Sequence, residues 1–467
     1  MDVYTVEEHG ESSAGRGGRE SSAERRTRLL RQGLKMFMCS LAMWTMGSMY
    51  VFPSVLAHDL AAHNTTIYGS PITLTSSQVD MAGSLVMLGS TVGAWVVAPL
   101  MMRLGRRACI LGSGSTAVLG WLGVALLPEP VGILVARGLS GMAAGGLSLV
   151  ANSYGIELAD PEVRGMMAMV LNLGILLGQV VTVSVGYDAR YFIVALVDMA
   201  LPLALLLSLF HLPESPPYLV LKGREGEARE VLLDLRGRCA DLEGEIQSYK
   251  DLNRTSESKG VWRDLLRPEV LKDLAVVSTL FILMYFTGYQ VISANTSRMF
   301  EAAGSSLDDS LATIIVNVVQ VAAAVAASLL MDRLGRRRST MLSYGVMCAA
   351  LGGLAVYLLA AGEQDPRPLA WVPLVCLMVT QGAVTVGVNP VPFILSSEYF
   401  PTRIRAWAAG ICYTVGNLAG FLALQLYTPM LEALGQVGLY AFYSAVCLAG
   451  VPFTYFFVRE TTGAKVG

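Results

Sequence analysis

The amino-acid sequence predicts an all-α membrane protein with twelve transmembrane helices in two related six-helix halves. Three observations lead to this fold class. The 467-residue chain is 54% hydrophobic and only 15% charged. Apolar stretches of about 20 residues, long enough to cross a ~30 Å hydrocarbon core as a helix, recur from Leu34 to Val458. Short charged motifs that follow two of these stretches return about half a chain later.

The predicted spans are continuously apolar and rich in Ala, Leu, Gly and Val. Strands of a membrane barrel would alternate apolar and polar residues over about ten positions, so the pattern favours helices. We place the spans, to within a few residues, at 34–57, 79–101, 108–127, 131–156, 166–187, 191–211, 272–293, 311–330, 340–361, 370–395, 406–428 and 437–457.

The basic residues set the expected topology, because cytoplasmic loops near the membrane retain Lys and Arg. With the N-terminus inside, only Arg190, Arg298 and Arg367 of the 34 basic residues fall on outer loops, and Arg137 falls within a span. We therefore expect a multi-pass protein of the cell membrane with both termini in the cytoplasm. The net charge of −2 gives no argument for a nucleic-acid partner, and we expect a monomer in contact with membrane lipid.

The chain divides into five expected segments. A disordered cytosolic tail (1–33), rich in Gly, Ser, Glu and Arg, precedes the N-terminal half (34–211), a cytosolic loop with short amphipathic helices (212–271), the C-terminal half (272–458) and a second cytosolic tail (459–467). The first outer loop carries a glycosylation sequon at Asn64. A second sequon, at Asn253, lies in the cytosolic loop and is expected to stay unmodified.

Two pairs of charged motifs indicate an internal duplication. Arg103-Leu104-Gly105-Arg106-Arg107 follows the second span, and Asp332-Arg333-Leu334-Gly335-Arg336-Arg337 follows the eighth. Glu157 and Arg164 after the fourth span correspond to Glu398 and Arg405 after the tenth, with equal spacing. We expect these arginines and carboxylates to form ion pairs that latch the cytoplasmic side of each half and break as the protein opens inward. Repeats of this kind place a substrate site near the membrane centre, between the halves.

Further motifs extend the pattern over nearly the whole chain. They are Arg137, Gly141, Gly145, Tyr154 and Gly165 around span four, Pro390-Val391-Pro392-Phe393 in span ten, Pro213-Glu214-Ser215-Pro216-Pro217-Tyr218-Leu219 after span six, and Glu460-Thr461-Thr462-Gly463 after span twelve. With the repeated motifs, they resemble the sugar porter family of the major facilitator superfamily. Leu242-Glu243-Gly244-Glu245-Ile246 and Val318-Val319-Gln320 are most similar to its insect trehalose-transporter-like branch. The resemblance implies the major facilitator fold and transport of a small-molecule sugar by alternating access, without a cofactor.

The chain also departs from the family pattern. Met102, Asn152 and Pro217 replace the family's Asp, Pro and Arg. Sugar porters carry two glutamines and an asparagine in span seven, whose amides bind sugar hydroxyls. The matching stretch here, Met284-Tyr285-Phe286-Thr287-Gly288-Tyr289-Gln290, lacks both glutamines and keeps one amide. Because each unpaired, desolvated hydroxyl costs about 1–3 kcal/mol, we expect altered selectivity.

Polar and aromatic residues inside the spans are the candidate substrate contacts. The polar candidates are Gln290, Asn295, Gln320, Asn389, Asn417, Asn172 and Gln179, and the aromatic candidates are Tyr285, Tyr289, Phe393 and Trp95. For each polar residue, a hydrogen bond that joins two helices is an equally open interpretation. Trehalose, glucose, another hexose and a polyol are all compatible with such a cavity.

The energy source is predicted from the first span, which contains no Asp or Glu. A titrating carboxylate is expected there in proton-driven sugar porters, so we predict facilitated diffusion. Asp198 in span six is costly to bury alone, and Arg137 in span four is its natural partner. A structural pair and a proton-coupling role both stay open, as does a non-transporting sugar sensor. The four His and seven Cys show no catalytic or metal-binding arrangement, so we expect neither an enzyme nor a metal site.

Overall fold

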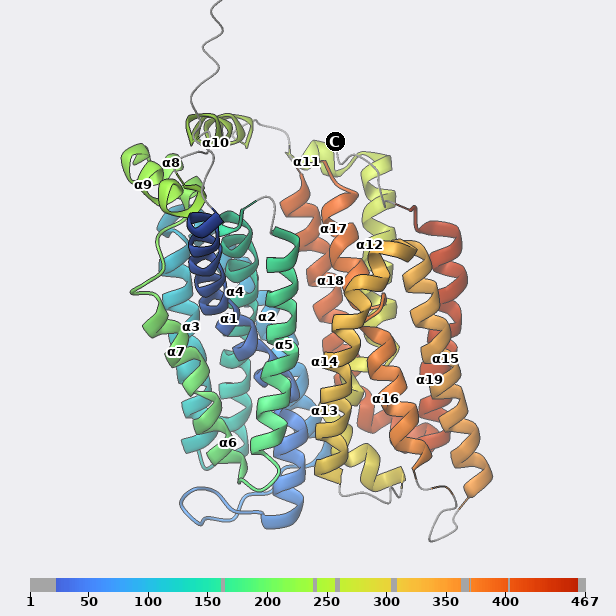
Figure 1. The fold of residues 1–467 in the computed structure, drawn as a ribbon. Coiled ribbons are helices and arrows are strands. Elements are labelled where there is room, and N and C mark those ends of the chain that lie inside the picture. The colour runs from blue at the N-terminus through green and yellow to red at the C-terminus, as the bar shows by residue number, and fades with distance from the viewer. Residues whose placement is uncertain are drawn as a thin grey trace, which may run out of the picture.

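The structure is a computed structural model, and it describes residues 22–160, 164–237, 242–256, 261–303, 309–362, 369, 371–401 and 404–460. Apart from an isolated bridge between Thr65 and Pro71, the regular structure of these residues is helical. Two helical bundles stand side by side, the first drawn in blue and green and the second in yellow to red (Figure 1). The all-α fold class predicted from the sequence is confirmed.

Each predicted span corresponds to one helix or to two consecutive helices. The first bundle contains α1 (Ser22–His63), α2 (Ser76–Leu104), α3 (Arg106–Leu126), α4 (Pro130–Leu158), α5 (Arg164–Val185), α6 (Tyr191–Asp198) and α7 (Ala200–Ser208). The connecting helices are α8 (Pro216–Leu221), α9 (Glu225–Arg236), α10 (Leu242–Ser256) and α11 (Val261–Leu265). The second bundle contains α12 (Pro268–Phe286), α13 (Tyr289–Ala303), α14 (Asp309–Leu334), α15 (Arg336–Ala361), α16 (Val372–Val384), α17 (Pro390–Glu398), α18 (Arg405–Gln425) and α19 (Tyr427–Phe457).

Eight described segments are long and apolar enough to cross a membrane, and three shorter apolar segments lie in α5, α14 and α16. Two predicted spans are clearly broken. Gly288, with a φ of +81° that suits glycine, separates α12 from α13. The tenth span breaks before Pro390, which has no backbone N–H to continue the preceding helix.

The first helix begins at Ser22, so residues 22–33 are helical where the sequence predicted an irregular tail. Contacts with other segments hold this extension. Gln32 donates a hydrogen bond to the backbone oxygen of Leu235 at 2.5 Å, and Lys35 lies 2.5 Å from Asp234. These partners belong to α9, more than 190 positions away, and such distant contacts leave no trace in local composition. The rest of the predicted tail lies outside the described residues.

Glycines let helices of the first bundle approach closely. A Cβ on Gly93 of α2 would collide with the backbone oxygen of Met142, and one on Gly145 of α4 with that of Ser90. Close backbone approach at small residues is the usual way in which membrane helices pack.

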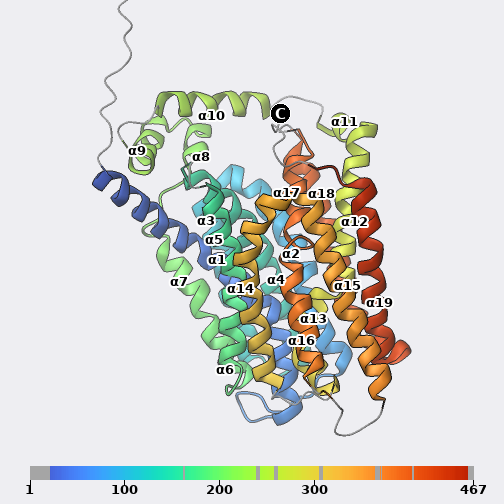
Figure 2. The ribbon, with the colours of Figure 1, turned by 45° about the vertical axis from the view of Figure 1, so that its right-hand side comes forward.

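Each bundle has its own hydrophobic core. Contacts between the bundles run mainly along three pairs of helices, α2 with α18, α1 with α13, and α5 with α14, with a smaller contact between α2 and α19. Helices α8–α11 lie at one end of the bundles, together with the start of α1 and the described C-terminal end (Figures 1 and 2). We call this end the linker face. The opposite end, which carries the loop of residues 64–75, is the sequon face.

Candidate functional site

The repeated charged motif forms the same tight turn in both halves, at the linker face. Gly105 between α2 and α3 has a φ of +90°, and Gly335 between α14 and α15 has a φ of +82°. Glycine adopts such angles without the strain that a Cβ brings. A Cβ would also collide with Glu214 at Gly105 and with Glu460 at Gly335. The duplication seen in the sequence is therefore a duplication of backbone geometry.

In the first half, Arg106 joins three segments. Its Nε and Nη2 donate to the two carboxylate oxygens of Glu157 at 3.0 and 2.7 Å. Such bidentate pairs are among the strongest hydrogen-bonded contacts in proteins. The Glu214 carboxylate accepts the backbone N–H of Arg106 at 2.9 Å, at the start of α3, where the helix dipole favours a negative charge. The ends of α3 and α4 and the chain before α8 are thereby held together.

The second half repeats this arrangement. Arg336 Nη2 donates to Glu398 Oε1 at 3.2 Å. Glu460 accepts the backbone N–H groups of Arg336 and Arg337 at 3.0 and 3.2 Å. The roles of Glu214 and Glu460 were missed in the sequence. Their equivalent positions in the sequence could have revealed them, because each follows the last span of its half.

The other predicted gate residues make main-chain contacts or face solvent. Those that donate to backbone oxygens are Arg107 to Leu209, Arg337 to Tyr455 and Arg405 to Phe400. Those with exposed side chains are Arg103 and Arg333. The side chains of Arg164 and Asp332 lie outside the described residues.

Arg137 and Asp198 are both fully buried, but the structure does not join them in a direct ion pair. Arg137 donates instead to the backbone oxygens of Ala82 at 2.9 Å and Met49 at 2.5 Å. Asp198 Oδ2 accepts the hydroxyl of Thr182 at 2.9 Å. The two charges still interact electrostatically, while Arg137 Nη1 and Asp198 Oδ1 have no hydrogen-bond partner. The guanidinium therefore connects α4 to α1 and α2, whereas the carboxylate connects α6 to α5.

Two predicted binding residues keep buried amide atoms without partners. Asn417 on α18 is 1% exposed, and neither its Oδ1 nor its Nδ2 has a hydrogen-bond partner. Gln179 on α5 is 5% exposed, and its Oε1 is unpartnered. A buried, unpaired polar group costs about 1–3 kcal/mol, so both amides are suited to a polar ligand. They belong to opposite halves.

The remaining predicted polar residues differ in burial and in hydrogen-bond partners. Gln290 and Gln320 are buried, Asn389 is half-buried and Asn172 is exposed. Asn295 is buried but occupied, because its Nδ2 donates to the backbone oxygen of Val291 and its Oδ1 accepts from Arg298.

Two further buried amides were missed in the sequence. Asn317 on α14 and Gln381 on α16 each have a side-chain oxygen without a partner. Gln381 also donates to the backbone oxygen of Tyr289 at 2.9 Å. A single amide within an apolar span is the sequence signal that points to such residues.

Aromatic side chains from several helices meet between the halves. The rings of Tyr285 and Tyr289 lie 5.9 Å apart, and the ring of Phe393 lies 6.2 Å from that of Tyr413. The hydroxyl of Tyr413 is 3.2 Å from that of Ser90 on α2, so this contact joins the two halves. We call the boundary between the halves, formed by the α2–α18, α1–α13 and α5–α14 contacts, the seam. Tyr285 thus occupies an aromatic setting where sugar porters have an amide. Trp95 donates to Thr414 at 2.7 Å and belongs to the same α2–α18 seam.

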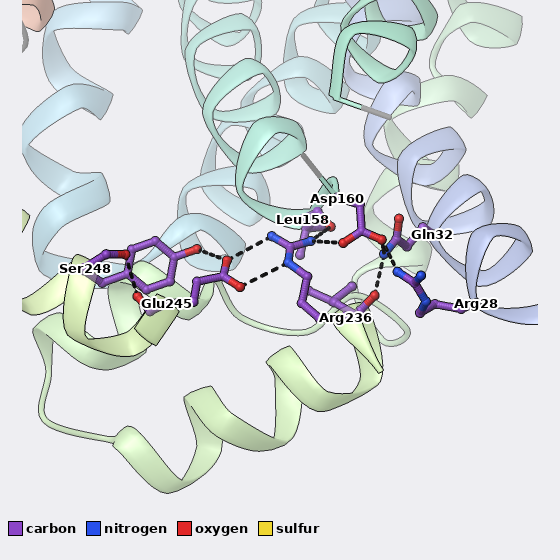
Figure 3. A network of polar contacts seen from close by, with 9 residues as sticks. Arg28, Gln32, Leu158, Asp160, Arg236, Glu245 and Ser248 are labelled. Carbon is purple, nitrogen blue, oxygen red and sulfur yellow. Dashed lines mark hydrogen bonds and ion pairs between the residues drawn. The ribbon is translucent and has the colours of Figure 1, made fainter. Parts of the chain in front are cut away.

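A polar network ties the linker helices to the first half (Figure 3). Arg236 of α9 is at its centre, with bonds to Asp160 after α4 and to Glu245 of α10 at 3.3 and 3.1 Å. Burial lowers the pKa of Arg236, but the hydrogen bond and charge of Glu245, together with the charge of Asp160, leave that pKa above its ordinary value. Burial and the hydrogen bond to Glu245 both raise the pKa of Tyr249. Arg28 of α1 also pairs with Asp160, so four separate segments share one cluster.

These features define a class of protein. Two helical bundles with several apolar segments long enough to cross a membrane, and with a matching charge cluster at the same face of each bundle, define a multi-pass membrane protein. The family model described as "Sugar (and other) transporter" matches residues 33–466. The chain belongs to this family, as the sequence motifs predicted.

Curated relatives carry the name "Facilitated trehalose transporter Tret1". The protein from Culex quinquefasciatus is 30% identical over 84% of this chain and 77% of its own length. The protein from Polypedilum vanderplanki is 30% identical over 90% of this chain and 85% of its own length. For the protein from Aedes aegypti, at 31% identity, the match covers 84% of this chain but 49% of the relative, so the chain spans about half of that protein.

Solved structures show the same fold. The partially occluded inward-open xylose transporter XylE from E. coli has a TM-score of 0.77 at 20% identity, with 92% of this chain and 98% of that chain covered. The inward-open form of the same transporter has a TM-score of 0.76 at 19% identity, with 92% and 97% covered. At this identity the likeness concerns the fold alone, and it agrees with the predicted twelve-helix architecture.

Proposed function

We propose that the protein is a facilitative transporter, a uniporter, that carries trehalose or a hexose across the cell membrane by alternating access. Relatives named as facilitated trehalose transporters support the cargo and the absence of ion coupling. The first span has no acidic side chain between residues 34 and 57, which also favours uniport. The observation that carries the proposal is Asn417, a buried amide with donor and acceptor both free for a hydroxylated ligand.

We orient the linker face toward the cytoplasm, because it collects most of the basic residues. Both ends of the described chain are then cytoplasmic (Figure 1). Asn64 is exposed at the sequon face and then lies on the outer side, where a glycan can be attached.

Uptake into vesicles that contain the purified full-length protein tests the cargo. We expect accumulation of labelled trehalose or glucose up to, and not beyond, the outside concentration. Asn417→Ala removes two hydrogen bonds to the ligand and is expected to raise KM at least about tenfold, the equivalent of 1.4 kcal/mol. The matched control is Asn152→Ala, because Asn152 is exposed and bonds to Ser148 of its own helix. Its KM should stay within about twofold.

Two results would contradict the proposal. Uptake of no sugar or polyol in a labelled panel would remove the cargo class, and binding without flux would indicate a sensor. An unchanged KM in Asn417→Ala would remove that residue from the binding site.

A proton-coupled symporter is the second candidate, and the unpartnered Oδ1 of Asp198 favours it. Burial of this oxygen without a hydrogen-bond partner favours binding of a proton, which would remove a buried charge, while the nearby Arg137 opposes that binding. In a symporter, an inward proton gradient would drive uptake above the outside concentration, and Asp198→Asn would abolish that accumulation. For the uniporter, we expect the same final level with and without the gradient.

A further inference from the structure

Asp80 on α2 and Arg298 on α13 form an ion pair between the two halves, near the sequon face. Arg298 Nη1 lies 2.9 Å from Asp80 Oδ1, and the Asp80 side chain is 0% exposed. The other oxygen, Oδ2, accepts the backbone N–H of Thr428 at the start of α19, at 3.0 Å. One carboxylate of the first half therefore holds two segments of the second half. Arg298 was expected on an outer loop, but it lies within a helix because α13 extends to Ala303.

The position of Arg298 is set by several contacts. Asn295 Oδ1 accepts from the same Nη1 at 2.9 Å, and the guanidinium lies 5.1 Å from the ring centre of Tyr427. Asn295 itself has non-helical angles (φ −126°, ψ 21°), so α13 is kinked just before Arg298. The neighbouring Ser297 lies 3.1 Å from the hydroxyl of Ser54 on α1, which adds a second polar contact across the seam. Asn295, predicted as a substrate contact, thus orients the arginine.

A cavity of about 350 Å³ opens on the solvent side of this pair. Its walls include His58, Asn64, Thr73, Ser76, Ser297 and Arg298, from both halves. Arg298, 22% exposed at its side chain, therefore stands between this open space and the buried carboxylate of Asp80.

We infer that Asp80 and Arg298 are the gate residues of the sequon face and set how often the protein opens on that side. A buried charge is tolerated only while its partner stays in place, whereas separation of the halves would return both charges to water. The intact pair therefore stabilises the state that is closed on the sequon face, and its loss favours the open state. The Arg106–Glu157 and Arg336–Glu398 pairs each lie within one half, so they do not join the halves in this way. The inference rests on the proposed alternation but not on the identity of the cargo.

Accessibility of a reporter thiol tests the gate without any substrate. Ser54→Cys places the reporter at the seam, where the native side chain is 1% exposed. The purified full-length protein in detergent is treated with a charged thiol reagent, and labelling of protein without the reporter is subtracted. In the Arg298→Gln background Asp80 is left buried without a counter-charge, so the closed state is weakened. We expect reporter labelling at least about tenfold faster than in the unmutated background.

The matched control is the Asp59–Arg190 pair, which lies near the same face at 2.8 Å but entirely within the first half. Arg190→Gln should leave the labelling rate within about twofold. Adding Asp80→Asn to Arg298→Gln removes the unpaired charge and should return labelling part of the way toward the original rate. Arg298→Lys keeps the positive charge and should label more slowly than Arg298→Gln. If fast labelling came only from misfolding at this position, the lysine variant would not slow it.

The gate would be overturned by either of two results with monodisperse protein. One is labelling of Arg298→Gln at the original rate. The other is equal acceleration by Arg190→Gln, which would indicate general loosening of this face. Failure to find a transported sugar would leave these rates unchanged, so the two proposals fail separately.

Discussion

Two glycines of α4 meet very different surroundings, although they lie on the same helix. At Gly145 a Cβ would collide with the backbone oxygen of Ser90 on α2, and backbone cannot yield without moving that helix. At Gly138 nothing lies within 4 Å. Replacement of a helical Gly by Ala gains up to about 1 kcal/mol, and this gain is common to both sites. The difference between Gly145→Ala and Gly138→Ala therefore isolates the steric cost, about 1–3 kcal/mol of stability lost.

The assay is thermal inactivation of the purified protein in detergent, followed as the fraction that stays monodisperse after heating. We expect Gly145→Ala to denature at a lower temperature than the unmutated protein, and Gly138→Ala at an equal or higher one. Only the rank order is compared, because membrane proteins commonly unfold irreversibly. Equal heat resistance of the two variants would refute the close approach of α2 and α4.

Three further predictions concern the charged clusters and the outer loop. Glu214→Gln removes the charge that accepts the N–H of Arg106, a contact worth about 1 kcal/mol, and should denature at a lower temperature than the unmutated protein in the same heating assay, whereas Glu227→Gln, in an exposed pair, should change little. Arg236→Gln leaves two carboxylates without their shared cation, and limited proteolysis of α9–α10 should become several-fold faster, in contrast to nearly unchanged cleavage in Lys250→Gln, whose pair with Glu225 between the same helices is more exposed to solvent. Asn64→Gln should increase gel mobility as glycosidase treatment does, and an unchanged band would exclude a glycan.

The helical spans were predictable because hydrophobicity along the chain is a local property. Lipid requires about 20 apolar residues for each crossing whatever the neighbours are, so length and composition suffice. The turns at Gly105 and Gly335 were equally visible, since a tight turn leaves a glycine and flanking charges in the sequence. The pairing of Arg106 with Glu157 followed from the repeat, because two copies with equal spacing constrain one another.

The substrate contacts were only partly predictable. Asn417 and Gln179 are buried with unpartnered atoms as a binding role requires, but Asn172, chosen by the same criterion, is exposed. Which side of a helix faces the seam depends on how the helix is rotated against its neighbours, and a uniformly apolar span does not record that rotation. For the same reason the buried amides of Asn317 and Gln381 were overlooked.

The sequence by itself determined that this chain is a two-half helical membrane protein, because crossing length, charge bias and repeated motifs are local features, and its motifs by their resemblance indicated a sugar porter. The tertiary structure decided which charges meet. Arg137 bonds to carbonyl oxygens of α1 and α2 instead of pairing directly with Asp198. Asp80 meets Arg298, 218 positions away, across the seam of the two halves. Such partners are chosen by the packing of whole helices, and a buried charge accepts whichever donor that packing brings within reach.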